Sequence, residues 1–330
     1  MFKTQYHRNT PMRIDKFLAE FLQDISRQQI QVLIKNNIVL KNGNIINKTK
    51  ELVSLGDIIE VNTPKIKHQP IILDDKLKQD LAEKVQILFE HKDFLIVNKP
   101  AGLLIHKTNN INSYSLVDIL IFKYPEIKEA VDDNQSKESI LQNRYGIVHR
   151  IDKDTSGLVI VARNKNALIR LKHLFKYRKV YKEYICLVRG IIKSDYGNIT
   201  YPITRSKLEH TKRVAVISDK QSQNIQRTAH TEYWVIQRYQ DSTLLKVVIH
   251  TGRTHQIRVH MQAIGHSIIG DKLYGGKLEH KDKNTIQRQF LHSSKLKFEY
   301  LGQEYEFLSD LPSNLMFYKS TKADLSTNIG

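Results

Sequence analysis

Two kinds of hydrophobic periodicity divide the chain. Apolar residues recur every three or four positions over residues 14–22 and again over residues 30–34, which predicts two short amphipathic helices. Short apolar runs around the turn signal Asn42-Gly43 follow and predict β-strands. The order helix, helix, strand and strand predicts a small, self-contained N-terminal domain.

Further along the chain the pattern favours strands. Apolar runs on either side of a polar turn predict a hairpin over residues 87–97, and those over residues 147–162 predict strand, turn and strand. Between the two domains, prolines and mixed charges predict a linker. The expected organisation is an N-terminal domain at residues 12–62, a linker at 63–86, a second domain at 87–318 and a flexible tail at 319–330.

The polar turn within residues 147–162 is the first candidate site. It places Asp152 near His149, Arg150 and Lys153, in a segment rich in Asp, Thr, Ser and Gly. A carboxylate held between two rigid strands has a fixed position, and cationic neighbours favour its charged form. Asp152 is therefore a candidate nucleophile or electrostatic anchor. The alternative is ordinary turn chemistry, in which the polar side chains bond to their own backbone.

The charge balance indicates a polyanionic partner. The 330 residues include 52 Lys and Arg against 34 Asp and Glu, a formal charge of +18. Between Arg163 and Arg213 there are fourteen basic residues and three acidic ones. Nucleic acid is favoured over membrane, because no segment resembles a signal peptide, a lipid anchor or a bilayer span. A single cysteine, Cys186, excludes an internal disulfide, so we expect a cytoplasmic protein.

Three residues outside the turn are candidates on local grounds. Tyr184 lies in an alternating strand, where it is either a platform for an unstacked base or a half-buried strand tyrosine. Arg253 and Arg258 lie among small polar residues and suit anion handling, and a buried Arg258 paired with a catalytic carboxylate would fix its aim. A metal site is disfavoured, because no zinc-ligand spacing matches the three histidines of this stretch. They are His250, His255 and His260.

A set of positions in the N-terminal domain matches a known RNA-binding module. They are Arg13-Ile14-Asp15, Leu18, Ser26-Arg27, Ile34, Val39, Asn42-Gly43 and Gly56-Asp57-Ile58. The domain resembles the αL module first described in a small-subunit ribosomal protein, with Asn37 in place of a usual glycine. Asparagine tolerates the left-handed backbone that glycine supplies there. We interpret four basic residues as RNA phosphate contacts rather than only a solvated charged face. They are Arg13, Lys16, Arg27 and Lys35.

The second domain carries five motifs in a recognisable order. They are residues 98–103 with His106, residues 149–158, Lys182 and Tyr184 with Gly190, residues 251–260, and Gly270-Asp271 with Tyr274-Gly275. Together they resemble the RluA-type, ribosomal large-subunit branch of the pseudouridine synthases, over residues 13–312. The departures are Ile151 for leucine, Cys186 for alanine and Ser267 for proline, and none of them changes a charged or stacking group. The stretch around Asp271 is assigned to support rather than chemistry.

The resemblance implies a fold and an activity. The fold is α+β, with a mixed, mainly antiparallel sheet and peripheral helices in the catalytic domain, preceded by the αL module. The activity is that of an RNA pseudouridine synthase, an isomerase of the intramolecular transferase type. It converts specific uridines of large-subunit (23S) ribosomal RNA, free or in a pre-ribosomal particle. No cofactor, metal, membrane or protein partner is implied.

The resemblance also assigns residues by matching position. Asp152 is the catalytic carboxylate, Tyr184 stacks on the target base, and Arg258 pairs with Asp152. Arg150 enters the RNA where the target nucleotide is flipped out. The further expected RNA contacts are Asn98, Lys99 and Arg253.

The chemistry suits these residue types. Breaking the bond between ribose and uracil develops oxocarbenium character, which an aimed carboxylate stabilises or traps. The uracil must then turn and rejoin through carbon, in a closed pocket that holds a flipped nucleotide. Attack by Asp152 on the anomeric carbon and removal of a sugar proton both stay open. The alternative functions are a non-catalytic RNA-binding or ribosome-assembly protein, and a nucleoside glycosidase that uses Asp152 and Asp154 as paired carboxylates.

Overall fold

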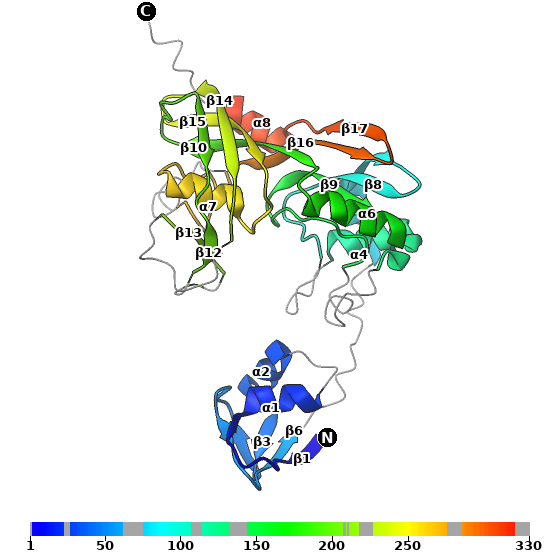
Figure 1. The fold of residues 1–330 in the computed structure, drawn as a ribbon, viewed down its shortest axis with the longest axis vertical. Helices are drawn as coiled ribbons and strands as arrows, with labels where there is room; N and C mark the ends of the chain where they lie inside the picture. The colour runs from blue at the N-terminus through cyan, green and yellow to red at the C-terminus, as the bar shows by residue number, and fades with distance from the viewer. Residues whose placement is uncertain are drawn as a thin grey trace, which may run out of the picture. The chain divides into compact units, whose positions relative to one another are not determined.

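The chain forms two compact units in a computed structural model (Figure 1). One unit comprises Met1–Asp75 with Lys107–Ser113, and the other comprises Lys76–His106 with Tyr114–Gly330. The structure describes residues 2–22, 27–61, 75–106, 114–131, 144–206, 209, 211–217, 227–275 and 286–320.

The first unit packs two helices on a small antiparallel sheet. Helices α1 and α2 span Ile14–Phe21 and Arg27–Lys35. The strands are β1 (Phe2–Gln5), β2 (Met12–Arg13), β3 (Val39–Lys41), β4 (Asn44–Ile46), β5 (Leu52–Val53) and β6 (Ile58–Val61). The sheet order is β1-β6-β3-β4, and β2 pairs with β5. Phe17, Leu18 and Ile30, which the helical periodicity selects, are buried in its core, so the predicted helices and strands are confirmed.

Residues with a left-handed backbone conformation form the turns of this unit, as predicted. Asn42 and Gly43 have φ angles of 52° and 78°, the pair of positive values that a type I′ turn requires between β3 and β4. Asn37 has a φ angle of 60°, so the asparagine adopts the conformation expected at a usual glycine position.

A nine-stranded sheet is the framework of the second unit. Its order is β11-β14-β15-β10-β16-β9-β8-β7, with β17 paired to β16. Its strands are β7 (Gln86–Glu90), β8 (Phe94–Lys99), β9 (Ser156–Ala162), β10 (Tyr181–Arg189), β11 (Tyr196–Ile199), β14 (Thr231–Arg238), β15 (Ser242–Ile249), β16 (Leu291–Tyr300) and β17 (Gln303–Leu308). In the described sheet, β9 and β16 form the one parallel pair. The predicted mixed, mainly antiparallel α+β architecture is therefore confirmed.

Shorter elements surround this sheet. They are α3 (Asp75–Lys84), α4 (Leu116–Lys123), the 3-10 helix η1 (Pro125–Glu129), α6 (Lys165–Lys176), α7 (Gln256–Ala263), α8 (Ser313–Ser320) and the hairpin β12 (Ile203–Arg205) and β13 (Arg213–Ala215). Helix α6 packs on β9, and α7 packs on β14 (Figure 1). Leu168 and Leu171 of α6 are buried.

The central strand β9 explains the unbroken apolar run of the sequence. It lies between β8 and β16, and all seven of its residues are buried. The second strand of the predicted strand-turn-strand unit is thus confirmed. The first is wrong, because Ile147 makes only an isolated bridge to Val161. The side chain of His149 instead accepts the amide hydrogen of Ile160 at 2.8 Å, which leaves no place there for a regular ladder.

Domain boundaries differ in detail from the predicted ones. Strand β1 belongs to the first unit although it precedes residue 12. Helix α3 lies inside the range predicted as linker, and Ala82 on it is buried. The remaining linker residues up to 74 and the tail from 321 lie outside the described residues.

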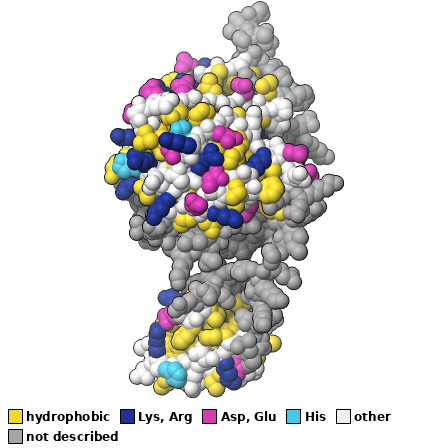
Figure 2. Space-filling view, turned by 90° about the vertical axis from the view of Figure 1, so that its right-hand side faces the viewer, with side chains coloured by type: hydrophobic (Ala, Val, Ile, Leu, Met, Phe, Trp, Pro, Cys, Tyr) yellow, Lys and Arg dark blue, Asp and Glu magenta, His cyan; other side chains and the backbone are white. Residues whose placement is uncertain are grey.

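The distribution of charged and apolar side chains indicates which kinds of partner the surface can contact. On the face in Figure 2, Lys and Arg side chains are interspersed with Asp and Glu in both units. In the described part of the chain, no helix is long and apolar enough to cross a membrane.

Candidate active site

A cleft opens in the second unit where three segments meet. These segments are the turn before β9, the middle of β10, and the loop that leads from β15 into α7. Five of the predicted site residues line it. They are Arg150, Asp152, Tyr184, Arg253 and Arg258.

The turn before β9 presents Asp152 to the cleft. Ile151 is buried and anchors the turn on one side, and the amide of Thr155 donates to the carbonyl of Asp152 at 3.2 Å on the other. The Asp152 side chain is 18% exposed. The carboxylate is therefore fixed by the backbone and yet reachable from the cleft.

Arg258 holds that carboxylate from the protein side. Its Nη1 donates to Asp152 Oδ2 at 2.8 Å, while Nε and Nη2 donate to the two oxygens of Asp271 at 2.7 and 2.9 Å. Asp271 is fully buried and also accepts the amides of Leu273 and Tyr274. Burial alone would lower the pKa of Arg258, but the hydrogen bonds and charges of Asp271 and Asp152 raise it above its ordinary value. The guanidinium therefore stays charged and rigidly aimed.

His255 approaches the other oxygen of Asp152. Its Nε2 lies 4.0 Å from Asp152 Oδ1, and its Nδ1 lies 2.9 Å from the hydroxyl of Tyr274. It has a left-handed φ of 59° at the start of α7. Burial lowers the pKa of His255, against the opposing effect of the Asp152 charge, so the imidazole is mainly neutral near pH 7. The arrangement leaves Asp152 as the group that bears negative charge in the cleft.

Tyr184 enters the cleft from β10. The predicted alternation is confirmed, since Lys182, Tyr184 and Cys186 are buried. Burial raises the pKa of the Tyr184 hydroxyl, so the side chain is a neutral phenol at physiological pH. The structure therefore brings an aromatic ring and the candidate carboxylate into one cleft.

Lys99 lies inside the protein rather than on its surface. Its side chain is fully buried, and its ammonium donates to the carbonyls of Pro100, Leu103 and Lys153 at 2.8 to 2.9 Å. This position contradicts the predicted contact of Lys99 with RNA, because all three donors of the ammonium are used. Lys99 instead ties the loop after β8 to the turn that carries Asp152.

Asn98 does not line the cleft. It lies on β8, partly exposed, and its side-chain amide donates to Gln86 at 3.3 Å. Asn98 therefore lies outside the lining of the cleft that contains Asp152, and its contact with RNA stays a prediction.

The two arginines at the rim differ in their bonding. Arg150 is exposed. Arg253 is half-buried, and its Nε donates to the carbonyl of Thr228 at 3.0 Å. Both remain predicted RNA contacts, and both border the cleft that contains Asp152.

His149, next to Arg150, has a structural position. Its ring stacks on Phe175 with centroids 4.5 Å apart. Burial lowers the pKa of His149 to about 3, so its Nε2 stays available to accept from Ile160. His149 therefore stabilises strand β9 and is not one of the cations that favour the charged form of Asp152.

The basic residues of the first unit also have different positions. Arg13 donates twice to the buried carboxylate of Asp15, at 3.0 and 2.8 Å, so its guanidinium is engaged within the unit. Lys16 and Lys35 are exposed. Arg27 begins α2, but its side chain lies outside the described residues.

The three evenly spaced histidines do not converge within the described part of the chain. His260 is buried and bonds to Thr231 and to the carbonyl of Tyr201, each at 2.9 Å. His255 bonds to Tyr274. His250 lies elsewhere, beside His230 and Glu232.

Comparison with known proteins shows which family this chain belongs to. Residues 93–263, just over half of the chain, match the family described as RNA pseudouridylate synthase. The chain belongs to this family. It is accordingly an RNA pseudouridine synthase, an isomerase, as predicted. Residues 12–59 match the S4 domain, which confirms the predicted RNA-binding module in the first unit.

Individual relatives of this pseudouridine synthase cover most of its length. An RNA pseudouridine synthase of Aquifex aeolicus is 39% identical over 83% of this chain and 80% of that protein. Ribosomal large subunit pseudouridine synthase D of Haemophilus ducreyi is 32% identical over 92% of this chain and 89% of that protein. The solved structure of human RNA pseudouridylate synthase domain containing 1 has 26% identity and a TM-score of 0.57, and the match covers 70% of this chain and 85% of that one.

Sequence reasoning missed two residues that shape this site. Asp271 was assigned only to a supporting turn, yet it fixes Arg258 by two hydrogen bonds. His255 was considered only as a metal ligand, yet it approaches Asp152. The Gly270-Asp271 dipeptide was the available signal for Asp271, but nothing local in the sequence indicates which arginine it binds.

Proposed function

We propose that this pseudouridine synthase isomerises specific uridines of large-subunit ribosomal RNA, with Asp152 as its catalytic carboxylate. One observation carries the assignment of Asp152. The carboxylate lies in the cleft and is aimed by Arg258, which is itself locked to the buried Asp271. The substrate class rests on the similarity to the large subunit synthase of Haemophilus ducreyi, which extends over nearly all of both chains.

Asp152 acts on the ribose side of the bond that breaks. Cleavage between the anomeric carbon and uracil nitrogen leaves positive character on the sugar, and a carboxylate in a partly desolvated cleft stabilises it. Attack on carbon and removal of a sugar proton both require the same aimed oxygen. Arg258 keeps this oxygen in place, and no external oxidant or reductant is needed because the product is an isomer.

Tyr184 serves the base rather than the sugar. The detached uracil has to stay in the cleft, turn, and rejoin through carbon. A neutral aromatic ring holds a flipped base by stacking without fixing its in-plane orientation. Arg150 is exposed and borders the cleft, and in this proposal it fills the gap that the flipped nucleotide leaves.

The geometry does not favour the glycosidase alternative. That mechanism needs two carboxylates around one sugar. Among the described residues that line the cleft, Asp152 is the one carboxylate, and Asp154 is exposed outside it.

Mapping of pseudouridine across ribosomal RNA tests the substrate assignment. The comparison uses cells with the wild-type gene, cells without it, and cells with Asp152→Ala. We expect the same few large-subunit sites to lose pseudouridine in both altered strains. An unchanged map would contradict the ribosomal substrate, and sites that persist with Asp152→Ala but not in the deletion would contradict the role of Asp152.

A further inference from the structure

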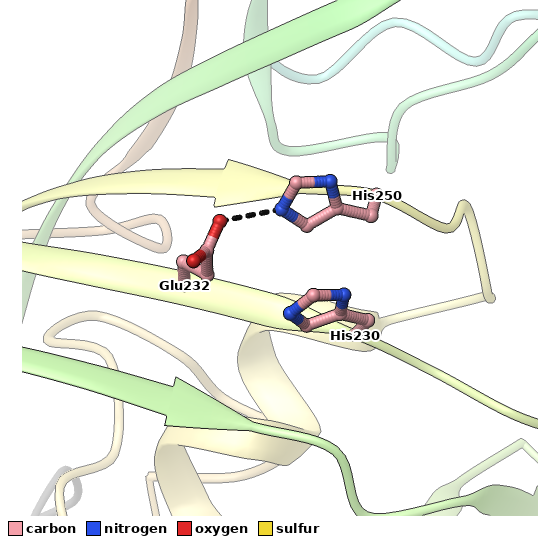
Figure 3. Close-up of side chains that lie close together, drawn as sticks. All are labelled: His230, Glu232 and His250. Carbon is pink, nitrogen blue, oxygen red and sulfur yellow. Dashed lines mark hydrogen bonds and ion pairs between the residues drawn. The ribbon is translucent and has the colours of Figure 1, made fainter. Parts of the chain in front are cut away.

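Three side chains suited to a transition metal converge outside the active-site cleft (Figure 3). They are His230, just before β14; Glu232, in β14; and His250, just after β15. Their ligand atoms all lie within 4.8 Å of one another. None of the three lines the cleft that contains Asp152, so the set is separate from the proposed chemistry.

The sheet register explains why these residues meet. The amide of His250 donates to the carbonyl of His230 at 3.1 Å, so the two histidines oppose each other where β14 and β15 pair. Their rings stack with centroids 4.2 Å apart and an interplanar angle of 22°. Glu232 lies two residues beyond His230 and therefore projects from the same face. Strand pairing, and not spacing along the chain, assembles the set.

The carboxylate of Glu232 is already oriented toward this point. One oxygen lies 2.5 Å from Nε2 of His250, and the other accepts from the hydroxyl of Tyr196 at 2.7 Å. These hydrogen bonds, that of Tyr196 first, lower the pKa of Glu232. Outer hydrogen bonds of this kind orient carboxylates that ligate metals. Glu232 is therefore anionic and aimed before any ion binds.

His230 supplies a ring nitrogen that lacks a hydrogen-bond partner. Its Nε2 is shielded from solvent, and no described residue hydrogen-bonds to it. Burial, followed by the neighbouring His250, lowers the pKa of His230, which favours the neutral imidazole. A shielded polar atom without a partner is energetically unfavourable, and a metal ion provides such a nitrogen with one.

We propose that His230, Glu232 and His250 bind one divalent late transition-metal ion of the Zn²⁺ class. Two imidazoles and one carboxylate form an established zinc ligand set that leaves a coordination position open. The two nitrogens disfavour Mg²⁺ and Ca²⁺, which prefer oxygen ligands.

Binding requires only small side-chain movements. Ligands at about 2.0–2.1 Å from a tetrahedral ion lie about 3.4 Å from one another. The 2.5 Å contact between His250 and Glu232 therefore opens, and the imidazole of His250 takes the tautomer in which Nε2 carries no hydrogen and is free to bind the ion.

Titration of the purified full-length protein with Zn²⁺ tests the proposal, with Co²⁺ as a spectroscopic probe. By calorimetry we expect one Zn²⁺ ion to bind tightly per chain. Bound Co²⁺ should give the visible absorption of a four- or five-coordinate ion, and this absorption should disappear when Zn²⁺ is added and displaces the Co²⁺. Glu232→Gln preserves shape but loses the anionic ligand, and His250→Ala removes a nitrogen. Each should weaken binding by about 100-fold or more, whereas Tyr196→Phe, which removes only the outer hydrogen bond, should weaken it by about 10-fold.

His173→Ala is the matched control, because His173 is an exposed histidine on α6 outside the set. It should bind Zn²⁺ as the wild type does. Circular dichroism and melting without metal establish that each variant is folded. Equal Zn²⁺ affinity of the wild type, Glu232→Gln and His250→Ala would overturn the proposal, as would absence of binding to folded wild-type protein at micromolar metal.

Discussion

Arg258 divides its guanidinium between two carboxylates that differ in exposure. Asp271 is fully buried and takes Nε and Nη2, and Asp152 is 18% exposed and takes Nη1. Because the buried pair fixes the plane of the guanidinium, the remaining nitrogen can point in only one direction. Asp271 therefore acts on Asp152 through Arg258, as a positioning residue.

Arg258→Lys tests this arrangement at the residue scale. Lysine keeps the positive charge but offers a single nitrogen, so it cannot bridge Asp271 and Asp152 in one plane. We expect kcat to fall by about 100-fold or more, with the Kd for RNA changed less than about threefold. Single-turnover rates and filter binding measure the two quantities.

Arg253→Lys is the control for that variant, because Arg253 borders the cleft without contacting Asp152 in the described structure. We expect it to change RNA affinity more than kcat. If Arg258→Lys weakened RNA binding and catalysis to the same extent, its positioning role would be wrong.

Strand β9 depends on glycine at its start. Gly157 has a φ of 111°, and a Cβ there would lie 2.2 Å from the backbone oxygen of Ser293 on β16. Gly157→Ala must therefore push apart the one described parallel strand pair of the sheet. We expect a loss of about 3 kcal/mol or more in the free energy of unfolding, measured by urea denaturation.

Gly102→Ala separates steric contact from backbone strain. Gly102 also has a positive φ, 85°, but nothing lies within 4 Å of the added Cβ. Its loss should be about 1 kcal/mol. Equal losses for the two variants would contradict the close approach of β9 and β16.

Lys99 links the loop after β8 to the Asp152 turn. Because its side chain is buried, the contribution of Lys99 to the stability of the fold depends on pH. Burial lowers the pKa of Lys99 from 10.5 to about 7, although Asp154 and Asp152 act in the opposite direction. Between these two values the unfolded chain binds a proton that the folded protein does not. The contribution of Lys99 to stability therefore rises with pH from about 7 to about 10.5.

Lys99→Met removes this titration. Relative to that variant, the wild type should gain roughly 2–4 kcal/mol of stability between pH 7 and pH 10. Urea midpoints of both proteins across this range measure the difference, in which other titrating groups cancel. Parallel stability curves would show that Lys99 does not change its protonation in this window.

Local sequence patterns predicted individual helices and strands better than they predicted which of these elements contact each other. The hairpin of β7 and β8 and strand β10 follow from runs and alternation of apolar residues, since periodicity reports which face is buried. The parallel pairing of β9 with β16 and the contact of Arg258 with Asp271 join distant segments. No local signal selects such partners, and helix α7, which carries Arg258, was not predicted.

At the scale of the whole molecule, the net charge of +18 indicates a polyanionic partner. The first unit, which contains the S4 domain and is called the S4 unit below, exposes Lys16 and Lys35 on its two helices. If each neutralises one phosphate, Lys16→Glu with Lys35→Glu should weaken RNA binding and lower the slope of log Kd against log salt by about 2.

Exposed lysines elsewhere on the same unit provide the control. Lys48→Glu with Lys50→Glu makes the same change in net charge at a different place. We expect a smaller loss of affinity from this pair. Equal effects of the two double variants would contradict a specific RNA-facing role for the helices of the S4 unit.

The whole-molecule prediction from sequence was strongest where several motifs occurred together. Composition alone gave only a polyanionic partner, whereas the ordered motifs gave the family and the cleft residues Asp152, Tyr184 and Arg258. It failed for Lys99, because a lysine beside a site reads as a surface cation unless its burial is known. It also missed the set of His230, Glu232 and His250, which strand pairing creates.

In the proposed mechanism Asp152 performs the chemistry, and the rest of the enzyme binds RNA. The most direct measurement compares wild-type protein with Asp152→Asn, which preserves side-chain shape and can still accept from Arg258. Pseudouridine formation in a single turnover and RNA affinity are measured on the same preparations. For Asp152→Asn we expect a rate at least about 1000-fold lower than that of the wild type, with an RNA Kd within about threefold. Pseudouridine formation near the wild-type rate, or a loss of RNA binding as large as the loss of rate, would contradict it.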